Sequence, residues 1–131
     1  MSVPKILGLR NVKVPVTDLH TALDWYGKVF GFRPTIEFAD SDGVVRGVHG
    51  EIPGIGEVLA LREDPAAARG LGVFAIANFA VADRLALQAW VAHLDELGVA
   101  HGPIVDAPRL SLLVLTNPDG QEIHLYTPIR D

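Results

Sequence analysis

The sequence repeats a short pattern half a chain apart. Val16-Thr17-Asp18 recurs as Val81-Ala82-Asp83, 65 positions later in a chain of 131 residues. Each copy ends a strand-like apolar stretch and begins a segment whose apolar residues recur every three or four positions, which is typical of a helix with one buried face. A repeat of this length fixes the architecture, because each copy must be one supersecondary unit that packs against the other.

Each copy of the pattern predicts a helix with its own start and stop signals. Asp18 and Asp83 stand at the N-cap, where a carboxylate accepts hydrogen bonds from backbone N–H groups that lack a partner within the helix. Gly31 and Gly98 follow the last apolar residue of each segment, as a glycine at the C′ position does. The two expected helices are 19–30 and 84–97.

Apolar or alternating stretches predict a strand before each helix and three strands after it. The eight stretches are 7–16, 32–39, 44–52, 57–62, 73–81, 99–105, 110–116 and 121–127. The order is β-α-β-β-β twice, an α+β fold with module one over about 5–62, a polar connector over 63–71 and module two over 72–128. Two curled sheets of this kind leave a concave cleft for a small ligand. A ferredoxin-like dimeric barrel, which has fewer strands per helix, is the alternative fold.

The last two strands are joined by the clearest turn signal in the chain, Asn117-Pro118-Asp119-Gly120. Proline presets φ, aspartate can bond its own backbone, and glycine accepts a positive φ. The strand after the turn alternates, so that Glu122, His124 and Tyr126 share one face. An acid, an imidazole and a phenol in one row make this face the first candidate for a functional site.

The composition narrows the class of protein. Cysteine is absent, which excludes disulfides, thiolate metal sites and cysteine nucleophiles, and fits a cytoplasmic protein without a secretory signal. No apolar run approaches the ~20 residues of a membrane span. The net charge is −5 and the basic residues are scattered, so nucleic acid is not an expected partner.

Three groups of residues together resemble the glyoxalase/bleomycin-resistance/dioxygenase family, the vicinal oxygen chelate superfamily. They are Asn11–Asp18 with Ala22–Tyr26 and Phe30–Phe32, then Phe79–Asp83 with Leu94–Val99, and finally Asn117–Leu125. The resemblance covers nearly the whole chain. It implies paired β-α-β-β-β modules that form a cupped sheet, commonly in a homodimer and sometimes with modules exchanged between chains.

The resemblance also implies where metal-dependent members place their ligands. Carried over by position, these ligands fall on Asn11, Ile76 and His124, with Glu57 or a residue near Ala60 closest to the remaining position. Neutral asparagine is a poor ligand for zinc or nickel, and isoleucine is none. The usual metal site is therefore not expected. An atypical site for Fe, Ni, Zn or Mn on His124, Glu57 and His49 stays open as an alternative.

The candidate site has a catalytic and a ligand-binding part. His124, with Glu122, is the candidate general base. The candidate ligand-binding residues are Asn11, Lys13, His49, Phe74, Ile76 and Tyr126. Glu122 is expected to pair with Lys13 or Arg109 across the sheet. For His49 we expect a hydrogen-bonded histidine within its sheet.

Two function classes follow. The first is metal-independent binding of a small, largely apolar or aromatic molecule, as in bleomycin-resistance-type members of the family. The second is an enzyme, either a metal-free lyase or isomerase with His124 as base, or an atypical metal-dependent enzyme such as a dioxygenase. No nucleophile elbow, phosphate loop or dinucleotide motif is present in the sequence. Of the two classes, we favour binding.

Overall fold

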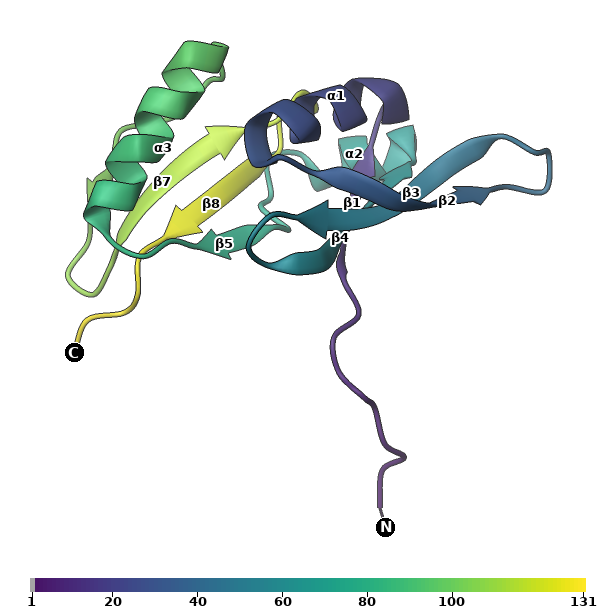
Figure 1. Cartoon of the computed structure of the whole chain (residues 1–131), viewed down its shortest axis with the longest axis horizontal. Helices are drawn as coiled ribbons and strands as arrows, with labels where there is room; N and C mark the ends of the chain where they lie inside the picture. Colours follow the sequence, from purple (N-terminus) through teal and green to yellow (C-terminus); the bar gives the residue numbers. More distant parts are fainter. Residues whose placement is uncertain (1) are drawn as a thin grey trace.

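Two four-stranded sheets, each with its own long helix, make up the computed structural model, which describes residues 2–131 (Figure 1). The elements are β1 (Val12–Val16), α1 (Leu19–Phe30), β2 (Arg33–Ala39), β3 (Val45–Ile52), β4 (Gly56–Glu63), α2 (Pro65–Leu71), β5 (Asn78–Ala80), α3 (Arg84–Leu97), β6 (Val105–Asp106), β7 (Ser111–Thr116) and β8 (Glu122–Tyr126). The expected α+β fold of two β-α-β-β-β modules is confirmed. Because three strands follow each long helix, the ferredoxin-like alternative is excluded.

The two sheets have the same topology. The strand orders are β1-β4-β3-β2 and β5-β8-β7-β6. In each sheet the opening strand pairs in parallel with the last strand of its module, and the other pairs are antiparallel. The repeat seen in the sequence is therefore a repeat of strand topology.

The residues at the ends of both long helices make the capping contacts that the sequence predicts. The carboxylate of Asp18 accepts from the Thr21 N–H at 2.8 Å, and that of Asp83 accepts from the Ala86 N–H at 2.9 Å. Gly31 and Gly98 both have φ of 70°, a left-handed conformation that glycine adopts without a steric penalty. Both long helices thus begin and end where the repeat places them.

Each sheet has one face toward its helix and one face away from it, which we call the open face. Along β7 and β8 the alternation is complete: Leu113, Leu115, Ile123 and Leu125 are buried, and the residues between them are partly exposed. Figure 1 shows α1 and α3 on one side of the sheets and the N-terminal segment leaving from the other side. The hydrophobic core therefore lies between the sheets and the helices, and the open faces remain accessible.

The hairpin turn at Asn117 joins the two modules. The side-chain amide of Asn117 is buried and donates to the Tyr26 hydroxyl oxygen of α1 at 3.2 Å. The Gln121 amide donates to the Pro15 carbonyl at 3.0 Å, and the Asp119 carboxylate accepts from the Thr17 N–H at 3.1 Å. Burial raises the pKa of Tyr26 to about 12, so the phenol stays protonated at neutral pH.

Four segments differ from the sequence-based expectation. The stretch 7–16 forms a strand only from Val12, where its ladder with β4 begins opposite Leu59. The stretch 73–81 keeps only three residues as β5, and 99–105 ends in the two-residue β6. The connector contains helix α2, capped by Asp64. Within residues 2–131 no helix is both long and apolar enough to cross a membrane.

We predict that Asn117→Ala lowers the free energy of unfolding by about 1–3 kcal/mol, because it leaves buried polar groups of Tyr26 and Gln121 without their partner. Asn78→Ala is the matched control, since Asn78 is exposed. Urea denaturation measures both variants. Equal losses in the two variants would contradict the proposed role of Asn117 in joining the modules.

Candidate functional site

The first group of expected site residues lies on the open face of the first sheet. The strand register aligns Lys13 of β1 with Ala60 of β4, and Ala60 with His49 of β3. Residues aligned in this way point to the same side of a sheet. Because Ala60 is small, the sheet is hollow between Lys13 and His49.

A cavity of about 330 Å³ occupies this hollow. Gly47 and Ala60 contribute small residues to its wall, and Asn11 and Lys13 line it as well. Phe38 of β2 also lines it, although half of its surface (50%) is exposed. An exposed aromatic ring beside small residues and a few polar groups is the kind of surface on which small organic molecules bind.

His49 is the most unusual residue of this face. It is only 6% exposed, and neither ring nitrogen has a hydrogen-bond partner among residues 2–131. The expectation that His49 is hydrogen-bonded within its sheet is therefore wrong. A buried polar group without a partner costs about 1–3 kcal/mol. A buried side chain of this kind calls for a specific explanation.

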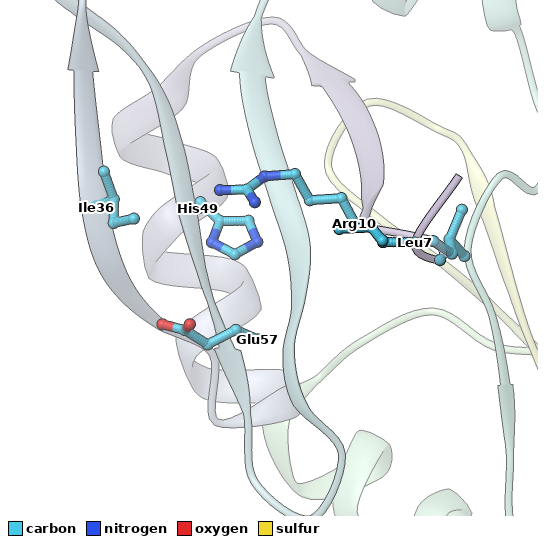
Figure 2. Close-up of a pocket in the computed structure, with 7 residues that line it drawn as sticks. Leu7, Arg10, Ile36, His49 and Glu57 are labelled. Carbon is cyan, nitrogen blue, oxygen red and sulfur yellow. The ribbon is translucent and has the colours of Figure 1, made fainter. Parts of the chain in front are cut away.

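A second cavity, of about 370 Å³, is lined by His49 and Arg10 as well. Figure 2 shows the Arg10 side chain extending from the N-terminal segment toward His49, with Ile36 and Glu57 on other sides of the cavity. Leu7 closes it from the N-terminal segment. His49 thus lines both of these cavities.

The basic side chains at the rim of the first cavity differ in whether they form an ion pair with a carboxylate of the protein. Arg62 donates twice to the Asp40 carboxylate, at 2.9 and 3.0 Å, and Arg46 donates to the same group at 2.9 Å. The Arg62 hydrogen bonds, followed by those of Arg46, lower the pKa of Asp40 to about 2. Arg62 is therefore neutralised by its own protein, whereas Arg10 and Lys13 have no ion pair within the part of the chain that the structure describes.

The second group of expected site residues forms a hydrogen-bonded row on β8. The Nε2 atom of His124 lies 2.9 Å from Glu122 Oε1, and its Nδ1 atom lies 2.8 Å from the Tyr126 hydroxyl oxygen. An Nε2–H that donates to the carboxylate leaves Nδ1 to accept from the phenol. Glu122 pairs with neither Lys13 nor Arg109, so the expectation of a cross-sheet ion pair is wrong.

The row has the connectivity of a proton relay. Because both ring nitrogens of His124 are engaged, the row presents the Tyr126 hydroxyl and the Glu122 carboxylate at its two ends rather than a free imidazole nitrogen. Asn78 of β5 lies opposite His124 in the strand register and is exposed on the same face. An acid–base reaction on this face would therefore use Tyr126 and His124 together.

The remaining expected residues lie outside the cavities around His49, on a segment that runs beside the start of β8, where the Val73 carbonyl accepts from the Glu122 N–H at 2.9 Å. Phe74 and Ile76 precede β5 and lie in no strand. Phe74 is 67% exposed, whereas Ile76 packs against the core. The cavities around His49 are lined entirely by residues before Glu63, so they do not reach β8. The site residues thus form two clusters, one on each sheet.

Sequence reasoning left out Arg10, Phe38, Arg62 and Asn78. Phe38 and Arg62 follow from alternation once the register of β2, β3 and β4 is known, but the register depends on irregularities near Pro34 and Phe38. Arg10 precedes β1, so the alternation of side chains along a strand does not predict where the Arg10 side chain lies. Asn78 shares its face with Ile76, and only the pairing of β5 with β8 brings it opposite His124.

The donor set does not fit a metal ion. Within residues 2–131 no group of three His, Cys, Asp or Glu side chains could hold one. His49 and Glu57 line one cavity, but His124 lies on the other sheet with both nitrogens hydrogen-bonded. Divalent transition metals need several imidazole or anionic donors around one point. We therefore derive no reaction step through a metal.

Comparison with known proteins identifies the family. Residues 8–125 match the family model of the Glyoxalase/Bleomycin resistance protein/Dioxygenase superfamily. The chain belongs to this superfamily. No curated protein sequence matches the chain.

Solved structures of the superfamily have the same fold. A glyoxylase/bleomycin resistance protein/dioxygenase domain from Frankia sp. EAN1pec is 21% identical, with a TM-score of 0.75, over 95% of this chain and 99% of that one. TnmS3, an antibiotic binding protein from Streptomyces sp. CB03234, is 24% identical, with a TM-score of 0.74, over 96% and 99%. FosX, a fosfomycin resistance protein from Listeria monocytogenes, is 14% identical, with a TM-score of 0.68, over 94% of each chain.

We predict that protein purified without a histidine tag holds no stoichiometric metal, because neither sheet presents a set of three donors. Elemental analysis measures the metal content, and titration with Ni²⁺, Zn²⁺, Mn²⁺ or Fe²⁺ measures affinity. Treatment with a chelator should leave the melting temperature unchanged. One equivalent of tightly bound metal would contradict this prediction.

Proposed function

We propose that this chain binds a small, largely apolar or aromatic molecule on the open face of its first sheet, without a metal. The observation that carries the proposal is His49, a buried imidazole that lines two cavities and has no hydrogen-bond partner among residues 2–131. Phe38 supplies an exposed aromatic surface, and Asn11 supplies an amide that can donate or accept. Membership of a superfamily with antibiotic-binding and fosfomycin-resistance proteins among its solved structures supports this function.

In our proposal Tyr126, Ile76 and Phe74 belong to a separate surface on the second module, the surface that the second candidate function below uses. The relevant form is a homodimer, because the exposed N-terminal segment carries apolar side chains that a second chain can cover. These side chains are Val3, Ile6, Leu7 and Leu9. Light scattering that gives the mass of a single chain would overturn the dimer.

We predict opposite effects of His49→Leu on stability and on binding. Leucine has a similar volume and no polar atoms, so the free energy of unfolding should rise by about 1 kcal/mol. Affinity for an aromatic compound selected by thermal-shift screening should fall about tenfold or more, because a hydrogen bond to the ligand is lost. Urea denaturation and calorimetric titration measure the two effects.

The control for this prediction is Leu85→Ala, which removes an exposed apolar side chain of α3 far from both cavities along the chain. It should change neither ligand affinity nor stability by a comparable amount. Loss of stability in His49→Leu, with affinity unchanged, would show that the imidazole is structural and would overturn the proposed site.

A second candidate function is a metal-free lyase or isomerase that uses the β8 row. The observation that favours it is the pair of hydrogen bonds that joins Glu122, His124 and Tyr126. In this reading His124 takes a proton through Tyr126 and Glu122 holds the imidazole ring in position. Such a relay contributes about 10²–10⁴-fold to a proton transfer.

This candidate predicts that His124→Ala abolishes turnover of the selected compound and leaves its affinity unchanged. Mass spectrometry of the incubated compound detects turnover, and calorimetry measures affinity. Tyr126→Phe should lose activity to a similar extent, since it removes the oxygen that meets the ligand. An unchanged compound after incubation with the wild-type protein would leave binding as the sole function.

A further inference from the structure

The basic residues at the rim of the first cavity are not all neutralised by carboxylates of the protein. Arg10, Lys13 and Arg62 all line this cavity, in a chain whose net charge is −5. Basic residues are the minority in the sequence, so three of them around one cavity are a local concentration. Concentrated charge in a concave site attracts ligands of the opposite sign.

The ion pairs show which of these charges are free to meet a ligand. Arg62 and Arg46 form a closed network with Asp40 and Asp42, in which two cations meet two carboxylates. Lys13 and Arg10 make no salt bridge and no side-chain hydrogen bond within residues 2–131. The network therefore leaves about two units of positive charge at the cavity.

Hydrogen-bond donors accompany this charge. An imidazole offers at least one N–H in either charge state, and both nitrogens of His49 lack a partner in the part of the chain that the structure describes. Figure 2 shows Arg10 directed toward the same ring. Glu57 lines the second cavity and does not line the first. The first cavity thus presents donors and cations, and no carboxylate without a partner, beside the Phe38 ring.

The spacing of these groups suits a compact acid. Lys13 and His49 stand on either side of Ala60, two strand spacings or roughly 10 Å apart at the backbone. Long side chains that converge over a small central residue can hold one anionic group between them. An aryl ring next to that group would lie on Phe38.

We infer that the ligand of the first cavity is an organic acid, an apolar or aromatic body with a carboxylate or similar anionic group that Arg10 and Lys13 bind. This inference rests on the proposed function and adds the charge of the ligand to it. Arg62 holds the rim of the cavity in place, and its charge stays paired with the carboxylate of Asp40. Association should be fastest at low ionic strength, because exposed charges are screened by salt.

The experiment compares a panel of aryl carboxylates, including naphthoates and phenylacetate, with the uncharged amide of each acid. Calorimetric titration at low and high salt measures both members of every pair. We expect each acid to bind about tenfold more tightly than its amide at low salt, the contribution of one charge-assisted hydrogen bond. The difference should shrink at high salt.

Two variants test whether residues of the first cavity cause the difference in affinity between acid and amide. Lys13→Gln and Arg10→Gln should each weaken the acids about tenfold and leave the amides unchanged, because glutamine lacks the cationic group that pairs with the acid. Lys28→Gln is the matched control, since Lys28 lies on α1 and pairs with Asp24. It should leave the acids unchanged, and unchanged melting temperatures confirm that all three variants fold.

The outcomes separate the two proposals. Amides that bind as tightly as their acids, or acids that bind Lys13→Gln and Arg10→Gln as they bind the wild type, overturn the acidic ligand and leave the proposed binding function standing. Failure of every acid and every amide to bind, together with failure of the thermal-shift screen, overturns both the acidic ligand and the proposed function.

Discussion

The buried amide of Asn117 is the interaction on which the arrangement of the two modules depends. It belongs to the turn between β7 and β8, yet it donates to Tyr26 of α1 and to the Gln121 side chain within its own turn. Gln121 reaches the carbonyl of Pro15 in β1. One hairpin of the second module thus holds the start of the first, and the aromatic contact of Phe30 with Phe79 and Trp90 continues the same junction.

With the modules joined in this way, only one face of each sheet is left to bind a ligand. Since the helices and the core occupy one side of each sheet, the polar residues that alternate with the core point to the other side. On β8 these residues satisfy one another, as the hydrogen bonds of His124 show. In the first sheet, His49 of β3 is buried and has no hydrogen-bond partner among residues 2–131. The asymmetry between two otherwise similar sheets is the reason to place the ligand on the first.

The parts of the fold that depend on local chemistry could be predicted from the sequence. Asp18, Asp83 and the glycines after both helices set the element order, and alternation placed His124 on the correct face of its strand. The environment of His49 could not be predicted, because it depends on neighbours from three other segments. Nor could the partner of Glu122, since two residues on one face of a strand can pair along it as well as across the sheet. Alternation also cannot tell where the ladder with a neighbouring strand begins, so it did not predict the later start of β1.

The central claim is that the ligand meets the imidazole of His49 rather than that of His124. Long-range ¹H–¹⁵N spectra of the histidine side chains, recorded with and without a bound aryl acid, test it most directly. The account predicts that the ring nitrogen signals of His49 change on binding, as one nitrogen gains a hydrogen-bond partner, while those of His124 keep their positions. A change confined to His124, with His49 unaffected, would contradict the account and place the ligand on β8.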